Sequence, residues 1–138
     1  MLFSRDWKTD KDLALKSVSR NGCSLELVNE TLRADKAVVL AAVSADGRAL
    51  QFADGSLKKD IEVVMAAVVQ NGAAIRLADG QYRKNKEVVM AAVKQDGLEL
   101  NFADDALQAD KDVVLEAVSQ NGRALEFASQ ALKADKDV

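Results

Sequence analysis

Residues 35–59 read DKAVVLAAVSADGRALQFADGSLKK, and the same pattern recurs without insertion along most of the chain. Copies follow at residues 60–84, 85–109 and 110–134, and a more divergent copy precedes it at residues 10–34. Repetition at a fixed period of 25 residues is typical of a solenoid, in which each repeat is one supersecondary unit stacked on its neighbours.

The composition predicts an aliphatic core in a mostly helical chain. Of 138 residues, 49% are hydrophobic, but the aromatic ones are only four Phe, one Trp and one Tyr. The core is therefore expected to consist of Val, Leu and Ala. The chain contains no proline, which suits helices whose turns are made by glycine.

The charges and the single cysteine limit the classes of partner and compartment. A net charge of −3 is small beside 19 basic and 22 acidic residues, so the balance requires neither a polyanion nor a polycation as partner. Cys23 has no second cysteine for an intramolecular disulfide, which favours a reducing compartment.

No apolar run is long enough to span a membrane, and the opening residues lack the apolar core of a signal peptide. A soluble, cytoplasmic protein is expected.

The first part of each repeat is predicted to be an α-helix. It opens with a residue whose side chain accepts hydrogen bonds from free helix amides, followed by an apolar run such as VVLAAV at residues 38–43. Valines alone would suggest a strand, but the run does not alternate, and the Ala-Ala pairs favour helix. Its wide apolar arc predicts a helix covered on several sides. The opening residues are Asp10, Asp35, Asp60, Asn85 and Asp110.

A glycine after Asn or Asp marks the end of this helix in every repeat. Glycine readily adopts the left-handed conformation that satisfies carbonyls at a helix end, so the pattern predicts a C-cap. These glycines are Gly22, Gly47, Gly72, Gly97 and Gly122.

The second part is predicted to be a short helix or 3₁₀ turn, followed by another cap residue and one more turn. Asn29 begins a match to the glycosylation sequon, but it occupies such a cap position, and we interpret it as a cap. Two rows are predicted to point inward. They are Leu25, Leu50, Ile75, Leu100 and Leu125, and then Leu27, Phe52, Leu77, Phe102 and Phe127.

The two ends follow the same period. Leu2 and Trp7 fall on inward positions of an earlier repeat, so residues 1–9 are predicted to form a half-repeat cap. Residues 135–138 begin a further repeat, which suggests a fragment of a longer array. The expected architecture is a single all-α repeat domain over residues 1–138, a right-handed α-solenoid of five repeats.

The repeat also resembles a known family. The pattern Asp-Lys-Glu/Asp-Val-Val-Leu/Met-x-Ala-Val-x-Gln-Asn-Gly, then Ala-Leu-x-Phe-Ala-x-x-x-Leu-Lys-x-Asp, is similar to a tandem helical-repeat family of unknown function. Residues 113–135 match it closely and residues 10–34 loosely. The resemblance implies α-helices that alternate with short or 3₁₀ helices, and it carries over no catalytic or binding residues.

Catalysis is not expected. The chain has no histidine. Histidine is the commonest general base, the usual partner of a Ser or Cys nucleophile, and the commonest metal ligand. Many carboxylates sit at repeated cap positions about 8–10 Å apart, too far to share a metal ion. Cys23 lies near Arg20 but has no histidine to activate it, so we interpret it as an incidental thiol. No enzyme activity, metal or cofactor is predicted.

Nucleic-acid binding is not expected either. Twelve basic residues gather at the junctions between repeats, but ten acidic residues share these junctions, and the repeats do not each offer a stacking aromatic residue. A solvated ridge of mixed charge is the favoured interpretation.

The function predicted from the pattern is a protein- or peptide-binding scaffold, and the alternative is a structural spacer or targeting arm of a larger protein. End-to-end self-association is a further possibility, because Val114, Val118 and Phe127 in the last repeat would lack a following helix. The binding face is predicted from the third, seventh, tenth and eleventh repeat positions, where small residues form a smooth central strip. Its residues are Ala41, Ala66, Val69, Gln70, Ala91, Lys94 and Gln95.

Overall fold

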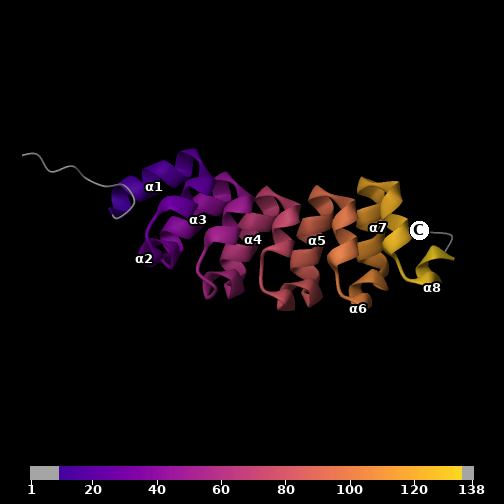
Figure 1. Cartoon of the computed structure of the whole chain (residues 1–138). Helices are drawn as coiled ribbons and strands as arrows, with labels where there is room; N and C mark the ends of the chain where they lie inside the picture. The colour runs from indigo at the N-terminus through magenta and orange to yellow at the C-terminus, as the bar shows by residue number, and fades with distance from the viewer. Residues whose placement is uncertain (1–9, 135–138) are drawn as a thin grey trace, which may run out of the picture.

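The computed structural model describes residues 10–134 as an elongated stack of five repeats (Figure 1). Each repeat begins with an α-helix that packs on the α-helix of the next repeat, which confirms the predicted all-α repeat fold. The helices are α1 (Lys11–Arg20), α3 (Lys36–Ala45), α4 (Ile61–Gln70), α5 (Lys86–Gln95) and α7 (Lys111–Gln120). The predicted half-repeat at residues 1–9 and the start of a sixth repeat at residues 135–138 lie outside the described residues.

Two short elements complete each repeat. The first is a 3₁₀ helix, and these pack on one another as a second layer beside the α-helices. They are η1 (Gly22–Leu27), η2 (Gly47–Phe52), η4 (Gly72–Arg76), η6 (Gly97–Phe102) and η7 (Gly122–Phe127). The second is a single short turn of helix, namely α2 (Glu30–Arg33), η3 (Leu57–Lys59), η5 (Gly80–Lys84), α6 (Asp105–Gln108) and α8 (Gln130–Lys133).

The predicted caps are confirmed. The Asp35 carboxylate accepts hydrogen bonds from the amides of Ala37 at 3.0 Å and Val38 at 3.3 Å, which satisfies two free donors at the start of α3. The other four opening residues cap their helices in the same way. Asn29 accepts a bond from the amide of Leu32 and caps α2.

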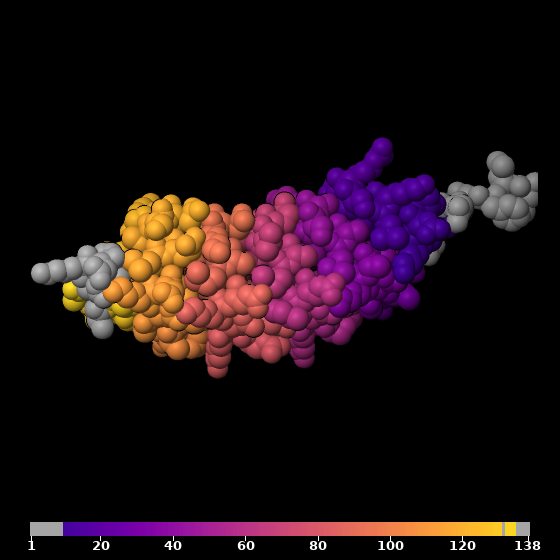
Figure 2. All heavy atoms as spheres, turned by 180° about the vertical axis from the view of Figure 1, so that it is seen from behind, coloured from indigo at the N-terminus to yellow at the C-terminus, as the bar shows by residue number. Residues whose placement is uncertain are grey.

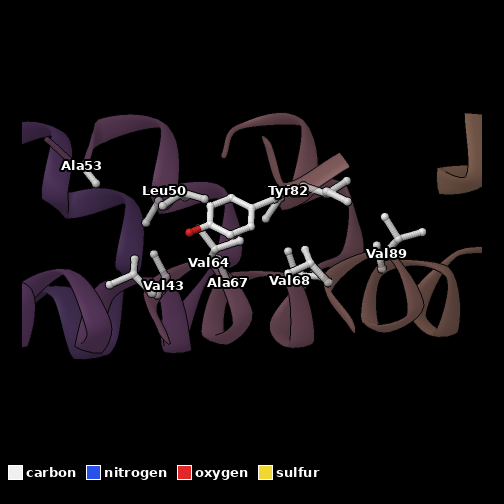
Figure 3. Close-up of a cluster of buried hydrophobic side chains, with 14 of the residues drawn as sticks. Val43, Leu50, Ala53, Val64, Ala67, Val68, Tyr82 and Val89 are labelled. Atoms are coloured by element: carbon white, nitrogen blue, oxygen red, sulfur yellow. The ribbon is translucent and has the colours of Figure 1, made fainter. Parts of the chain in front are cut away.

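The core is continuous from repeat to repeat and is mostly aliphatic, with Tyr82 as a buried aromatic member (Figure 3). In α3 the buried residues are Val38, Val39, Ala42 and Val43, which form two adjacent stripes that meet the preceding and the following repeat. The largest fully buried side chains include Leu25, Leu50, Ile75 and Leu100 from the 3₁₀ layer. One of the predicted inward rows is thus confirmed in these four repeats.

The second predicted inward row is confirmed only in part. Leu27 is 55% exposed, whereas Phe52, Leu77 and Phe127 are partly buried and pack against the core. A 3₁₀ helix has three residues per turn, so the residue that shares the inner face with Leu25 is Val28, and Leu27 turns toward solvent. Val28 is accordingly buried, as is Ala53 after Leu50.

The predicted left-handed glycine caps are also wrong. Among residues 10–134, no glycine has a positive φ angle. Each α-helix instead ends at the preceding Asn or Asp in extended conformation, such as Asp46 with φ −153°, whose side chain then caps the 3₁₀ helix. Gly47 is the first residue of that 3₁₀ helix.

Close packing between repeats explains the glycine. A Cβ atom built on Gly97 would lie 2.1 Å from the carbonyl oxygen of Ala117, and one on Gly22 would lie 2.2 Å from that of Ala42. Gly47 and Gly72 meet the next repeat in the same way. A side chain at these positions would separate the two repeats, so glycine permits the close approach of two backbones.

Candidate functional site

Helix α4 carries an apolar stripe on its outer surface. Ile61, Met65 and Val69 follow one another at four-residue steps, so they lie along one face of the helix. Ile61 is 42% exposed and Val69 is 55% exposed, whereas Met65 is partly buried against the core. These three residues are called the α4 stripe below.

The α4 stripe is peculiar to the third repeat. In the other α-helices the same positions carry Lys first, then Leu or Met, and then Ser or Lys. Ile61 and Val69 therefore replace polar residues, and they are two of the three large hydrophobic side chains exposed within residues 10–134. Two of these three exposed side chains thus lie in the third repeat, at the middle of the stack.

The structure brings part of the predicted binding face together beside this stripe. Ala66, Val69 and Gln70 line a shallow hollow of about 460 Å³ together with Met65 and with Ser44 of α3. The remaining predicted residues lie on the flanking helices outside this lining: Ala41 and Ala91 are partly buried, and Lys94 and Gln95 are exposed.

Gln70 has a structural role that the sequence did not suggest. Its side-chain oxygen Oε1 accepts a hydrogen bond of 2.5 Å from the backbone amide of Gly47 in the preceding repeat. The side chain therefore links two repeats at the glycine contact, and it is only partly available to a ligand.

Ile61 also interrupts a ladder of ion pairs between consecutive repeats. In each pair, the lysine at the second position of one repeat binds the aspartate carboxylate at the first position of the next repeat. The distance is 3.0 Å in Lys11–Asp35 and in Lys36–Asp60, and 2.9 Å in Lys86–Asp110. Between the third and fourth repeats these two positions hold Ile61 and Asn85, so both charges are replaced together. A comparison of equivalent repeat positions would have identified Ile61, which our prediction missed.

A buried ion pair crosses the same junction in the 3₁₀ layer. Glu99 is 1% exposed, and its carboxylate accepts bonds of 2.6 and 3.1 Å from the guanidinium group of Arg76. This bond raises the pKa of Arg76, and the guanidinium carbon also lies 4.3 Å from the centre of the Phe102 ring. The other repeats hold Ala or Ser at the position of Glu99, so the pair distinguishes the junction between the third and fourth repeats.

Comparison with protein-family models gives four overlapping matches, at residues 10–58, 35–83, 60–108 and 85–133, to a domain of unknown function designated DUF4116. The chain belongs to the DUF4116 family. Each match starts at the first residue of a repeat and extends through most of the next, which confirms the predicted tandem-repeat family of unknown function. Comparisons with curated proteins and with solved structures find no match.

One free thiol, that of Cys23, lies within the described part of this DUF4116 chain. The thiol of Cys23 donates a hydrogen bond of 3.6 Å to Asp46. Burial, and then the Asp46 carboxylate, raise the pKa of this thiol, whereas a nucleophilic cysteine needs a lowered one. Within residues 10–134 no cluster of three His, Cys, Asp or Glu side chains is placed to hold a metal ion. None of the helices described is both long and apolar enough to cross a membrane.

The ion-pair ladder predicts that this DUF4116 domain loses stability in acid. The bond from Lys36 lowers the pKa of Asp60, and the bond from Lys86 lowers that of Asp110. A lowered pKa in the folded state contributes stability above the unfolded pKa of about 3.9, and this contribution is lost as the pH falls through the folded pKa. The bond from Arg48 likewise lowers the pKa of Asp46, to about 2. Urea unfolding measured from neutral pH down to about pH 2 should show a falling free energy of unfolding.

Asp60→Asn is the matched control for this pH dependence. Asn85 already caps α5 through its side-chain oxygen, so the variant keeps the cap and removes the titrating group. Its free energy of unfolding should vary less with pH than that of the natural chain. Identical pH profiles for the two proteins would show that the ladder does not contribute.

Proposed function

We propose that this DUF4116 chain is a non-catalytic protein-binding module whose α4 stripe receives an apolar face of a helical segment in a partner protein. The observation that carries the proposal is the exposure of Ile61 and Val69 on one face of one helix, where the other repeats have polar residues. Clustered exposed apolar side chains with polar surroundings are typical of interaction sites.

The dimensions of the α4 stripe suit a helical ligand. Three residues at four-residue steps span about 12 Å along α4, at 1.5 Å per residue. An amphipathic helix presents its own anchors at three- and four-residue steps and therefore over a similar length. The hollow between α3 and α4 offers a place for one anchor side chain beside Val69 and Ala66.

The surroundings suggest the polar part of the ligand. Lys94 occupies the position of Val69 in the next repeat and is exposed, and it makes no ion pair within the described residues. A partner helix with an acidic residue beside its apolar face would meet this ammonium group. Lys36 and Lys86, by contrast, already bind carboxylates of the following repeats.

The test is selection of binders from a displayed library of amphipathic helical peptides, followed by affinity measurement on variants. Val69→Lys gives α4 the residue that α5 has at this position, and it should weaken binding at least about tenfold because a buried apolar contact is replaced by a charge. Since Val69 is exposed, the melting temperature should remain that of the natural chain.

Ser119→Lys on α7 is the control, because it introduces the same charge at the same repeat position, which is also exposed. Peptides selected on the natural chain should bind this variant unchanged. Binding that Val69→Lys does not alter would contradict the proposed site. A library that yields no binder would favour the spacer or targeting arm, which needs no ligand.

A further inference from the structure

We propose that the bound helix carries an acidic residue seven positions before a basic one and lies antiparallel to α4, because the two ends of the α4 stripe are flanked by opposite charges. This inference deepens the proposed function and rests on it, since it concerns the ligand of the same stripe. The stripe and the neighbouring helix α5 lie in the middle of the stack, with repeats on both sides, as the succession of colours in Figure 2 shows.

The ends of the stack take no part in this contact. End-to-end association through the fifth repeat stays a prediction, because residues 135–138 lie outside the described residues. Its expectation that Val114 lacks cover is wrong, since this side chain is fully buried.

The Ile61 end of the α4 stripe is flanked by negative charge. At two other junctions, the lysine at the second position of one repeat also binds the acidic residue at the third position of the next repeat. These pairs are Lys36–Glu62 and Lys86–Asp112, both at 3.3 Å. Glu87 holds the third position of the fourth repeat, so the same register places it beside Ile61, which offers it no positive charge. Glu87 is exposed, and its carboxylate makes no ion pair within residues 10–134.

The Val69 end of the stripe is flanked by positive charge. Lys94 on α5 holds the position that Val69 holds on α4, and the other three repeats have serine there. The two helices pack on each other, so equivalent positions lie one helix spacing apart, about 8–10 Å. A ligand helix that covers Val69 therefore comes close to the exposed ammonium group of Lys94, which likewise has no ion-pair partner among the described residues.

The spacing of these two charges defines a pattern in the ligand. Glu87 and Lys94 are seven residues apart, close to two helical turns, so they lie on one face of α5 about 10 Å apart. A helical ligand presents side chains on one face at the same interval of seven residues. Its basic residue would meet Glu87 and its acidic residue would meet Lys94, while the apolar residues between them cover the stripe. Charges at the rim of an apolar contact contribute mainly to specificity and to the rate of association.

The direction of the ligand follows from its own helix dipole. An acidic residue stabilises a helix near its N-terminus, and a basic residue does so near its C-terminus. A short ligand helix is therefore most stable when the acidic residue comes first. With that residue at Lys94 and the basic residue at Glu87, the ligand runs from the end of α5 towards its start. It is then antiparallel to α4 as well, since the first turns of successive α-helices lie side by side in the ion-pair ladder.

Peptides selected on the natural chain test this inference first through their sequences. Their apolar faces should be accompanied by Asp or Glu seven positions before Lys or Arg. Exchanging these two residues in a selected peptide should weaken its binding to the natural chain about tenfold at low salt, and added salt should reduce the difference. A nitroxide label at the N-terminus of the selected peptide should broaden the amide signals of α4 more strongly near Val69 than near Ile61.

The variant with both Glu87→Lys and Lys94→Glu should reverse the preference, so that the peptide with exchanged charges binds more tightly than the selected one. The net charge of the chain is unchanged in this variant, so general electrostatic attraction would not explain a reversal. Asp112→Lys with Ser119→Glu is the control, because it places the same two residues at the same repeat positions of α7. The control should prefer the selected peptide as the natural chain does, and circular dichroism should show that both variants are folded.

Val69→Lys distinguishes failure of this inference from failure of the proposed site. If Val69→Lys weakens binding but the charge reversal leaves the order of the two peptides unchanged, the stripe binds a helix and the inference about its charges is overturned. Stronger broadening near Ile61 than near Val69 would overturn the antiparallel direction. If Val69→Lys has no effect, or the library yields no binder, the proposed site itself is wrong and this inference falls with it.

Discussion

Replacing Gly97 by alanine should destabilise the stack strongly, because the added Cβ atom would lie 2.1 Å from the carbonyl oxygen of Ala117. Overpacking usually costs about 1–3 kcal/mol. Here the Cβ atom is fixed directly to one backbone and meets a backbone oxygen of the next repeat, so no side chain can rotate away. We expect a loss near the upper end, about 3 kcal/mol, and a melting temperature lower by about 10 °C. Thermal and urea unfolding at low protein concentration measure both quantities.

Gly122→Ala and Gly55→Ala are the matched controls for this prediction. Both glycines have open space where a Cβ would lie, and no described glycine has a positive φ angle. Both variants should therefore unfold close to the natural chain, within about 0.5 kcal/mol. If Gly122→Ala lost as much stability as Gly97→Ala, backbone conformation and not contact with the next repeat would explain the glycines.

The elements that could be predicted from the sequence are those with local signals. The period locates each repeat, and an Asp or Asn cap followed by a wide apolar run is sufficient to place a helix such as α3. The glycine after each helix illustrates the limit of such signals. Glycine is favoured both where the next repeat approaches closely and where a helix ends in a left-handed cap. Only the packed structure shows which of the two reasons applies here.

The spacing within the 3₁₀ layer was predicted only in part. Leu25 and Leu27 are two residues apart, which would place both on one face of a strand but not of a 3₁₀ helix. Val28, one full turn after Leu25, fills the core instead. The element was expected to be either a short helix or a 3₁₀ turn, and its inner face can be assigned only once the three-residue turn of a 3₁₀ helix is chosen.

The candidate site was also predicted in part. A smooth face through Ala66 and Val69 follows from helical spacing alone, whereas Ile61 and Met65 lie at positions that are Lys, Leu or Met in the other repeats. The replacement of Lys by Ile61, together with that of Asp by Asn85, is visible only when equivalent positions are compared between adjacent repeats. Contacts between repeats determine this pattern, so no single repeat contains it.

Replacing Arg76 should lower the free energy of unfolding much more than replacing Glu99, its partner in the buried ion pair. Arg76→Ala leaves a carboxylate that is 1% exposed without its cation, and removal of one partner from a buried pair typically costs about 3–5 kcal/mol. We expect about 3 kcal/mol, because Arg76 itself is partly exposed and water can reach its place. Glu99→Ala should be nearly neutral, since three of the other repeats have Ala at this position and the released guanidinium group can be solvated.

A double-mutant cycle measured by urea unfolding tests this asymmetry. The variant with both residues changed to alanine should recover most of the stability lost in Arg76→Ala, with a coupling free energy of about 2–3 kcal/mol between the two sites. Gln51→Ala is the control for Arg76→Ala, because Gln51 is exposed at the same repeat position and the following repeat has the uncharged Ala74 at the position of Glu99. Equal losses from the two single variants at Arg76 and Glu99, or additive losses in the double variant, would contradict the prediction. An asymmetric and coupled result would mean that the third and fourth repeats fit each other better than either fits a repeat without the pair, so that the ion pair helps to set the order of repeats along the stack.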